Sequence, residues 1–566
     1  MKYQPPEGVI AAEDVLSRMK AAGVDVLFAN GGTDFPSIIE AYARAPETGI
    51  DMPEPVIITH EGVALGMAHG YYLMAGKPAG VIVHVNVGLA NSVMGIVNAA
   101  SEQIPLLMCS GRTPLTENNR FGSRSSPIHW GQEMRDQAAM IREVVKWDYE
   151  LRYPEQAGAV IDRAMSIALS EPCGPVYVSL PREVLAEAVP GSQAQAKPSV
   201  APTRYAAADA AQVAHVADLL AKARRPVIIT QSPDHHSGFE PLASMAEKHA
   251  LPVVEYWSTR QALPTSHPMH AGRDPTPWVR DADVIVAVNA MVPWVSDHVS
   301  PPEGCVVVGL GPDPQFRAVP MRSFEMDISL GGGTQATLQA LSDALDAAAT
   351  GDDHAERRAR VAAFRDEQAQ AVAKRVQQGR GRPMNPAYVS QCLSDAADDN
   401  TTFFNELGFD PGVMQFDAPK TYFSSPLSGG LGWGLTAALG AQLADRSRQV
   451  VACIGDGSYV FANPVACHQT AASHGLPLLT VVFNNGIWNA VRRSTLYMYP
   501  DGKAATANTM PITQLAAMPD HAAIARAHGA HAERVEDGAD LPDAIARALE
   551  ATRNGQQALL DVVVSY

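Results

Sequence analysis

The sequence predicts an α/β protein composed of three doubly wound parallel-sheet domains. Short, nearly continuous apolar runs, such as residues 450–454 and 478–483, have the pattern of parallel strands that are buried on both faces. Helical stretches separate these runs, as the crossover connections between parallel strands require. Two shifts to linker-like composition, at about residues 190–205 and 379–383, indicate domain boundaries. The expected domains span residues 1–190, 191–375 and 376–566.

Composition and charge argue against several classes of protein. The chain has 566 residues, of which 46% are hydrophobic, so it is long and apolar enough for several large cores. Its formal charge of −17 argues against a nucleic acid or an anionic membrane as partner. The six cysteines include no Cys-x-x-Cys pair and are expected to be buried thiols in a reducing compartment. With no apolar N-terminal signal segment and no apolar run of about 18 residues, a cytoplasmic protein is expected.

Polar side chains interrupt the apolar pattern of the first domain at two places. Its expected strands are residues 24–28, 56–60, 81–88, 104–111 and 174–181. Glu61 follows the second of these strands at the start of a helix rich in small residues, and His84 lies on the third. A glutamate in the first turn of a helix often serves only the helix dipole, and a single strand histidine is usually a core residue. The residues around Glu61 and His84 in the sequence favour catalytic roles for both.

The middle domain has the pattern of a structural α/β unit. Its expected strands are residues 226–230, 252–256, 284–288 and 305–309. The glycines 331–333 are not in a Gly-x-Gly-x-x-Gly frame, so no nucleotide-binding fingerprint is present in this domain. A charged helix is expected over residues 355–378, ahead of the second linker.

The third domain contains the most informative stretch, a β-α-β unit over residues 449–488. Its first strand ends in Gly455-Asp456-Gly457-Ser458, and its second ends in Asn484-Asn485-Gly486. Both polar clusters therefore lie at carboxyl ends of parallel strands, where open α/β sheets bind ligands. A carboxylate and an amide offer hard oxygen ligands for a small divalent cation, and the glycines allow the backbone to approach a phosphate.

This Gly-Asp-Gly, helix, strand and Asn-Asn pattern resembles the cofactor motif of thiamine diphosphate (ThDP) enzymes. The resemblance implies that Asp456, the Asn485 side chain and the Ile487 carbonyl hold Mg2+, with Gly457 and Ser458 at the diphosphate. Asn485 comes 29 residues after Asp456, about two later than in the commonest form of the motif, and residues 459–464 are expected to hold the extra length.

An upstream segment, residues 428–432, resembles the part of these enzymes that lies under the thiazolium ring. The resemblance implies that the Gly429 carbonyl receives the aminopyrimidine amine. It also implies that Leu431 is the bulky residue that bends the cofactor into a V.

The first domain resembles the same enzymes at two motifs. His60-Glu61 before a small-residue helix implies that Glu61 hydrogen-bonds the aminopyrimidine and favours the imino tautomer, whose nitrogen removes the thiazolium C2 proton. The spacing of His84, Gly88 and Asn91 resembles the His-x-x-x-Gly-x-x-Asn of benzoylformate decarboxylase, which implies a catalytic acid/base role for His84. The same comparison places Thr33 at the substrate carboxylate.

Other segments of the chain also resemble ThDP enzymes, but they point to two different subfamilies. Residues 129–137 resemble the Phe-Gln-Glu-x-Asp stretch of acetolactate synthases, which carry no histidine at the place of His84. His298 lies about where benzoylformate decarboxylase has a second catalytic histidine, the alternative being a surface histidine. Ala490 is expected on the substrate side of the metal motif.

The resemblance extends over essentially the whole chain and implies pyrimidine-binding, central and diphosphate-binding domains in that order. The implied reaction is ThDP- and Mg2+-dependent, non-oxidative decarboxylation of a 2-oxo acid to an aldehyde through a thiazolium enamine. Acetolactate synthase-like carboligation and 2-hydroxyacyl lyase activity remain alternatives. A non-enzymatic scaffold protein with this fold is a further alternative. The presence of Glu61 argues against it. Because complete sites in this family form between two chains, a homodimer or homotetramer is expected.

Overall fold

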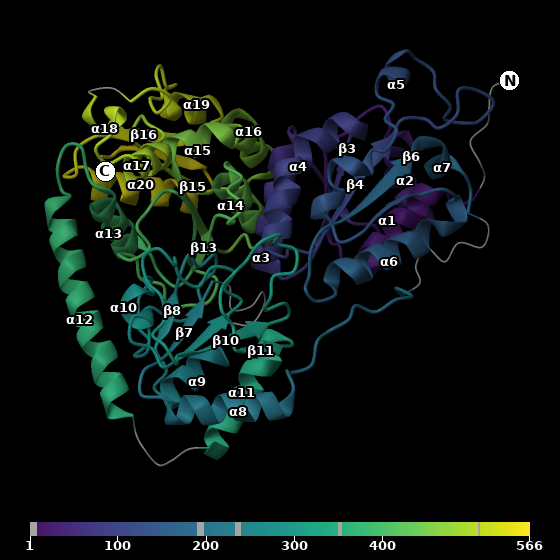
Figure 1. Ribbon diagram of the computed structural model, residues 1–566. Coiled ribbons are helices and arrows are strands. Elements are labelled where there is room, and N and C mark those ends of the chain that lie inside the picture. The colour runs from purple at the N-terminus through teal and green to yellow at the C-terminus, as the bar shows by residue number, and fades with distance from the viewer. Residues whose placement is uncertain (1–7, 190–196, 232–238, 349–353, 508–509, 566) are drawn as a thin grey trace. The chain divides into compact units, whose positions relative to one another are not determined.

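The computed structural model describes residues 8–189, 197–231, 239–348, 354–507 and 510–565 (Figure 1). It contains three parallel sheets of six, five and six strands. The predicted fold class, three parallel-sheet α/β domains, is confirmed. By its internal contacts the chain divides into two units, which we call the first unit (Met1–Arg204 with Pro426–Arg446) and the second unit (Tyr205–Ser425 with Ser447–Tyr566).

The first unit contains the first sheet, with the strand order β2-β1-β3-β4-β6-β5. Its strands are β1 (Val26–Ala29), β2 (Glu54–Ile57), β3 (Ala79–Val83), β4 (Leu106–Arg112), β5 (Asp148–Glu150) and β6 (Val176–Pro181). Its longer helices are α1 (Ala11–Ala21), α2 (Pro36–Thr48), α3 (Glu61–Ala75), α4 (Val85–Ser101), α6 (Ala157–Leu169) and α14 (Trp433–Ala444). Because β1 lies between β2 and β3, the strand order reverses at β1, which places a switch point at the carboxyl ends of β1 and β3.

The prediction of a strand over residues 81–88 is wrong, because β3 ends at Val83 and α4 begins at Val85. The backbone N–H of Gly88 donates to the His84 carbonyl at 2.7 Å, which makes His84 the residue that caps α4. Val85 adopts a φ of 30°, and this local conformation turns the chain from strand to helix. His84 therefore lies at the end of β3 and not within it.

The second unit contains the other two sheets. The middle sheet has the order β11-β10-β9-β7-β8, with strands β7 (Pro226–Thr230), β8 (Val253–Glu255), β9 (Val284–Val288), β10 (Val306–Gly311) and β11 (Ile328–Gly331). Four of these were expected, and β11 is the fifth. The predicted charged helix is α12, Ala355–Gln378.

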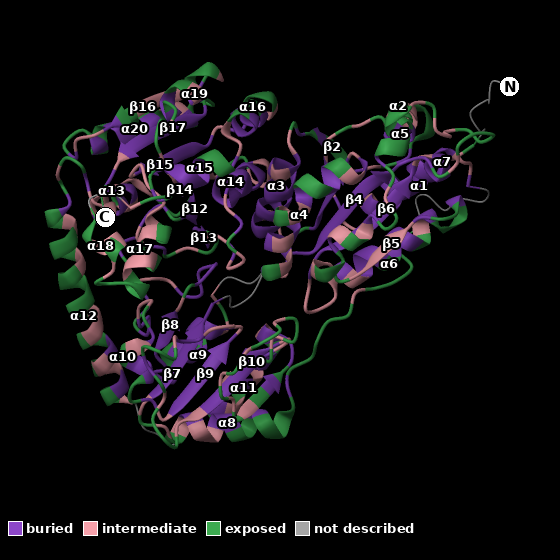
Figure 2. Cartoon of the chain, turned by 45° about the horizontal axis from the view of Figure 1, so that its top comes forward, coloured by how far each residue is buried: buried purple, intermediate pink, exposed green. Residues whose placement is uncertain are grey.

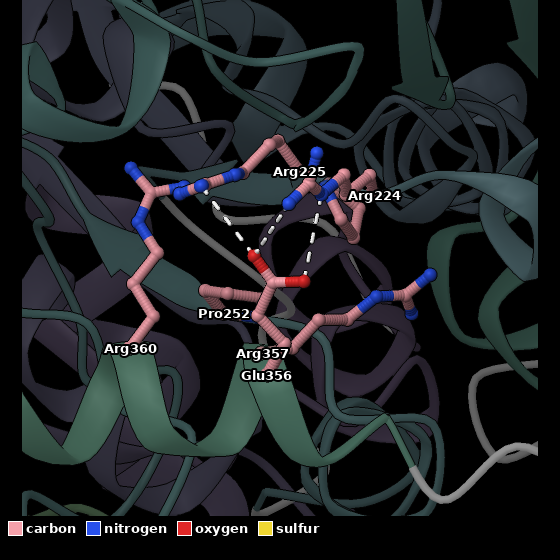
Figure 3. A pocket seen from close by; sticks show the side chains of 7 residues that line it. Arg224, Arg225, Pro252, Glu356, Arg357 and Arg360 are labelled. Atoms are coloured by element: carbon pink, nitrogen blue, oxygen red, sulfur yellow. Dashed lines mark hydrogen bonds and ion pairs between the residues drawn. The ribbon is translucent and has the colours of Figure 1, made fainter.

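Ion pairs fasten the start of α12 to the middle sheet. Glu356 pairs with Arg224 at 3.2 Å and with Arg225 at 3.5 Å, as the dashed lines of Figure 3 show. One turn further, Arg360 pairs with Asp281 at 2.8 Å. Arg224, Arg225 and Arg360 thus have carboxylate partners, and Arg357 donates to backbone carbonyls. We therefore assign this arginine cluster a structural role.

The third sheet has the order β13-β12-β14-β15-β17-β16. Its strands are β12 (Thr401–Glu406), β13 (Tyr422–Ser424), β14 (Gln449–Gly455), β15 (Leu479–Asn484), β16 (His531–Val535) and β17 (Ala558–Val563). Its helices are α13 (Pro386–Ala396), α15 (Asp456–Phe461), α16 (Pro464–His474), α17 (Asn489–Met498), α18 (Lys503–Thr506), α19 (His521–Ala527) and α20 (Leu541–Arg553). Residues 459–464 form the end of α15, the break between the two helices and the first residue of α16.

The central strands of all three sheets are buried, whereas the edge strands β2, β5, β11 and β16 are partly exposed and α12 presents an exposed face along its length (Figure 2). Part of the first predicted linker, residues 190–196, lies outside the described residues. Within the described ranges, no helix combines the length and the apolar character that a membrane span requires.

In the first unit, α14 crosses α3 at very close range (Figure 1). A Cβ atom on Gly70 of α3 would overlap the backbone of Ala437, and one on Gly440 of α14 would overlap the backbone of Met67. The small residues that the sequence places on α3 therefore allow two helix backbones to touch. This crossing joins residues 426–446 to the first unit.

We expect Gly70→Ala to destabilise the protein, because the added methyl group would meet backbone atoms that cannot rotate away. Overpacking of this kind typically costs about 1–3 kcal/mol of the free energy of unfolding. Differential scanning fluorimetry should show a lower melting temperature for Gly70→Ala. Gly331→Ala is the matched control, since no atom lies within 4 Å of its added Cβ. Equal melting temperatures for the two variants would contradict the close crossing.

Candidate active site

A buried carboxylate holds the ring of His84 in the first unit. Asp34 lies in the loop between β1 and α2, with only 5% of its surface exposed. One of its oxygens accepts a hydrogen bond from Nδ1 of His84, and the other accepts one from the backbone N–H of Val85 at 3.3 Å. The Asp34 carboxylate raises the pKa of His84 above its usual value, although burial acts in the opposite direction.

The other ring nitrogen of His84 faces Gln132, whose Nε2 lies 3.1 Å from Nε2 of the imidazole. Gln132 is buried and follows the short helix α5 (Ile128–Gly131). In the neutral ring, Nε2 accepts from the Gln132 amide, whereas in the imidazolium Nε2 donates and the amide turns to offer its oxygen. Asp34 can therefore keep its bond to Nδ1 while a proton enters or leaves at Nε2.

The His84–Gln132 contact joins two segments that pointed to different enzymes in the sequence. His84 belongs to the motif that resembles benzoylformate decarboxylase, and Gln132 to the stretch that resembles acetolactate synthases. Both line a narrow pocket together with Thr33, Thr113, His129 and Arg182. Thr33, predicted to contact the substrate, is exposed and lies at this pocket.

One face of α4 carries the polar contacts of this half-site. His84, Asn91 and Asn98 follow one another at intervals of seven residues, which is close to two helical turns, so they align along the helix. His84 caps the helix at the pocket. Asn91 contacts Glu61, and Asn98 contacts the loop before α14.

Glu61 is the first residue of α3, and 8% of it is exposed. Its Oε2 accepts a hydrogen bond from Nδ2 of Asn91 at 3.2 Å. The preceding residue, His60, caps α3 through Nδ1, which accepts from the Gly62 N–H at 3.1 Å. The carboxyl group is thus placed between the starts of α3 and α4, on a rigid part of the fold.

Asn98 fixes the loop that carries the predicted aminopyrimidine acceptor. Its Nδ2 donates to the Gly430 carbonyl at 3.0 Å, and its Oδ1 accepts from the Gly430 N–H at 3.3 Å and from Ser428 Oγ at 2.7 Å. Gly429, between them, is exposed and has a φ of 75°, which favours glycine. Leu431 follows as a partly buried residue.

The second unit places the predicted metal ligands at neighbouring strand ends. Asp456 begins α15 directly after β14, Asn485 follows β15, and the two strands pair in parallel up to Gly455 and Phe483. The Asp456 carboxylate accepts from the N–H of Gly457 at 2.8 Å and from the N–H of Gly486 at 2.7 Å. It therefore bridges the two loops, as the β-α-β pattern indicated.

The chemistry of these donors fits a small divalent cation. Asp456 is 3% exposed, and burial raises the pKa of its carboxyl group, which a bound cation would offset. Each of its two oxygens has about two lone-pair sites, and the backbone hydrogen bonds from Gly457 and Gly486 go to different oxygens, so lone pairs remain for a metal. Asn485 Oδ1 likewise accepts from the Ile487 N–H, at 2.9 Å, and from no other donor among the described residues.

The described residues contain no group of three His, Cys, Asp or Glu side chains that could hold a metal ion. The proposed ligand set does not require one, because it consists of a carboxylate, an amide oxygen and a backbone carbonyl. Mg2+ in such sites completes its octahedron with phosphate oxygens and water.

The remaining predicted residues also lie in the second unit. His298 is exposed after β9, and its ring centroid is 6.3 Å from that of Tyr497 near the end of α17. Ala490 is exposed in the first turn of the same helix. The structure thus brings His298 to the helix that follows the predicted metal ligands, and places His84 in the other unit.

Sequence reasoning did not identify Asp34 or Asn98 as parts of the site. Asp34 stands next to Thr33 at the end of a strand, which was a usable signal. The seven-residue spacing from His84 through Asn91 to Asn98 was another, but it is informative only once α4 is known to begin at Val85.

Comparison with known proteins identifies the family of the chain. Three domain models of thiamine pyrophosphate enzymes match the chain: the N-terminal binding domain at residues 10–140, the central domain at 213–341 and the C-terminal binding domain at 411–562. The chain belongs to the thiamine pyrophosphate enzymes. The two binding domains of this family contain Glu61 and Asp456, respectively.

Relatives in the thiamine pyrophosphate enzymes have different activities. A benzoylformate decarboxylase of Pseudomonas aeruginosa is 27% identical, over 89% of this chain and 91% of its own length. A sulfoacetaldehyde acetyltransferase of Rhodobacter capsulatus is 25% identical, over 96% of this chain and 92% of its own length. Among solved structures, a putative thiamin diphosphate-dependent enzyme from Mycobacterium smegmatis superposes with a TM-score of 0.77 at 25% identity, covering 99% of this chain and 100% of its own.

We expect Asp34→Asn to lower the pKa of His84, because the neutral amide removes the charge that favours the imidazolium. NMR titration of isotope-labelled histidines, with the His84 signal assigned by substitution, would measure the pKa of His84 in both proteins. Because the pKa of His84 is raised in the folded protein, the interaction of Asp34 with the imidazolium stabilises the fold at low pH. This contribution to the free energy of unfolding is lost as the pH rises through the pKa of His84. The stability difference between wild type and Asp34→Asn should therefore shrink with rising pH.

Asp25→Asn is the control for this titration. Asp25 is also an ion-paired aspartate of the first unit, but its partners are Lys20 and Lys77. It should leave the His84 titration unchanged. An unchanged His84 pKa in Asp34→Asn would show that the carboxylate does not control the ring.

Proposed function

We propose that the protein catalyses the non-oxidative decarboxylation of a 2-oxo acid to an aldehyde, with ThDP and Mg2+ as cofactors. The observation that carries this proposal is His84, held at Nδ1 by Asp34 with Nε2 at a pocket. When bound, ThDP supplies the electron sink for the electron pair left by departing CO2. A proton must then be delivered to carbon, and a histidine with a raised pKa is suited to deliver it near neutral pH.

Two sets of residues, contributed by two copies of the chain in the proposed oligomer, would hold the cofactor. In the second unit, Asp456, Asn485 and the Ile487 carbonyl are the proposed Mg2+ ligands, and the backbone at Gly457 and Ser458 the diphosphate-binding turn. In the first unit, Glu61 and the Gly429 carbonyl are the proposed partners of the aminopyrimidine, with Leu431 supporting the bent conformation. Asn91 and Asn98 would keep this pair of groups in place through α4.

His84 would act as the proton donor through Nε2. Asp34 holds the ring orientation through Nδ1, and Gln132 can accept from the imidazolium and donate to the neutral ring. Both protonation states of His84 are therefore satisfied within the pocket. The Thr33 hydroxyl would contact the carboxylate of the substrate, and Ala490 and His298 would lie on the substrate side of α17.

Carboligation is the second candidate, in which the acyl group is transferred to a second carbonyl compound. The contact of Gln132 with His84 favours it, because Gln132 belongs to the synthase-like stretch. Relatives that include acetolactate synthases, at 26% identity, support the same alternative. The two reactions share every step up to loss of CO2, so they differ only in what reaches the reactive carbon next.

We further propose that the active protein is a homodimer or a homotetramer of this chain. The proposal rests on the family, in which complete sites form between two chains, and on the distribution of the half-sites. Glu61 and the loop at Gly429 belong to the first unit, whereas Asp456 and Asn485 belong to the second.

We expect Asp456→Ala to weaken ThDP binding in the presence of Mg2+ by at least tenfold, because it removes the charged member of the proposed ligand set. Isothermal titration calorimetry of the purified protein with ThDP, with and without Mg2+, would measure this. Asp501→Ala, at an exposed aspartate of the second unit, is the control and should bind as wild type does. Unchanged Mg2+-dependent affinity in Asp456→Ala would rule out this residue as a ligand.

We expect His84→Ala to reduce aldehyde formation from 2-oxo acids by about 10²–10⁴-fold, the usual contribution of a positioned acid or base. A panel of 2-oxo acids, tested with and without an acceptor aldehyde, would be followed by CO2 release and product analysis. His215→Ala, at an exposed histidine, is the matched control. Formation of hydroxyketones at an unchanged rate in His84→Ala would favour carboligation instead.

A further inference from the structure

We infer that Arg182 binds a second anionic group of the substrate, one that stays on the molecule when CO2 leaves. The inference rests on the proposed function, because it assigns the substrate class of the His84 pocket. Arg182 directly follows Pro181, the last residue of β6, and is the first residue of the short helix α7 (Arg182–Ala186). It therefore stands at a carboxyl end of the first sheet, and it lines the same pocket as His84.

The Arg182 guanidinium has no hydrogen-bond or ion-pair partner among the described residues. Several other arginines of the first unit are paired with carboxylates: Arg18 with Asp162, Arg112 with Glu133 and Glu150, and Arg142 with Asp136 and Asp148. Arg182 is only partly buried, so its charge is available at the pocket.

Neither the carboxylate next to Arg182 in the chain, that of Glu183, nor the carboxylate on the pocket wall, that of Asp34, is paired with it. Glu183, its neighbour in the chain, is buried, and its Oε1 accepts from the backbone N–H and the hydroxyl of Thr116, both at 2.8 Å. Its Oε2 has no hydrogen-bond partner among the described residues, and no ion pair joins it to Arg182. Asp34, on the pocket wall, accepts from His84 and from the Val85 N–H. An incoming anion would thus find a guanidinium whose donors are not committed.

The other titratable group at the pocket adds no negative charge. His129 is 5% exposed, and its Nδ1 accepts from the Ser125 N–H at 3.1 Å. Burial lowers the pKa of His129, and the charges of Arg182 and Arg124 act in the same direction. When His84 is protonated its charge matches that of Asp34, and the residues that line the pocket then carry the net positive charge of Arg182.

Chemistry distinguishes the two anionic groups that a guanidinium could bind here. The carboxylate next to the 2-oxo group loses its charge as CO2 departs, so a cation fixed on it would stabilise the substrate more than the transition state and slow the reaction. A carboxylate, sulfonate or phosphonate at the far end keeps its charge throughout. Such a group matches the planar, bidentate donor set of arginine.

The test compares two substrates of equal chain length, 2-oxopentanoate and 2-oxopentanedioate, which differ only in a terminal carboxylate. With ThDP and Mg2+ present, we expect wild type to prefer the dianion in kcat/KM by about 10- to 100-fold, the usual effect of a hydrogen-bonded charge pair. Arg182→Gln should abolish this preference, and Arg182→Lys should retain part of it. 3-Sulfopyruvate and phosphonopyruvate, each compared with 2-oxobutanoate, would distinguish the type of anion.

Arg152→Gln, at an exposed arginine of the first unit that lies over Tyr149, is the matched control and should keep the wild-type preference. Equal use of the two substrates by wild type, or a preference unchanged in Arg182→Gln, would overturn the inference.

Calorimetry separates this inference from the proposed function. If no 2-oxo acid releases CO2, decarboxylation is refuted, and 2-oxopentanedioate then serves as an unreactive ligand. Binding of 2-oxopentanedioate that is tighter than that of 2-oxopentanoate, and lost in Arg182→Gln, would still establish the anion site. Absence of such binding in wild type would overturn the anion site as well.

Discussion

The burial of the Asp34 carboxylate is the constraint on which the first half-site depends. Asp34 packs so closely against β4 that a Cβ atom on Gly111 would overlap its carboxylate. A buried carboxylate without partners would be costly, and the two donors that satisfy it, His84 Nδ1 and the Val85 N–H, are both at the start of α4. The same contact therefore joins β1, β3 and β4, begins α4, and orients the imidazole toward Gln132.

Once α4 is placed in this way, its helical period determines the positions of the other groups. Asn91 lies two turns after His84 and holds Glu61, and Asn98 lies two turns further and holds the loop around Gly429. The proposed proton donor, the proposed activating carboxylate and the proposed aminopyrimidine acceptor are thus arranged along one rigid helix. Rigid placement of this kind is what catalysis by positioning requires.

The second half-site has a simpler physical basis. Parallel pairing of β14 with β15 aligns their carboxyl ends, and the Asp456 carboxylate joins the two following loops by accepting from Gly457 and Gly486. Here the order of strands along the chain and their order in the sheet agree. For this reason the juxtaposition of Asp456 and Asn485 could be predicted from a β-α-β pattern in the sequence.

The sequence by itself determined the fold class and the half-site around Asp456, because buried apolar runs, helix periods and strand-end polar clusters are local signals. It did not determine where β3 ends, the pairing of Asp34 with His84, or the meeting of Gln132 with His84. These contacts join residues about 50 positions apart, and partners at such separations depend on how the strands are ordered. The freedom of Arg182 is likewise a tertiary property, because an unpaired charge is recognised only when the partners of every neighbouring carboxylate are known.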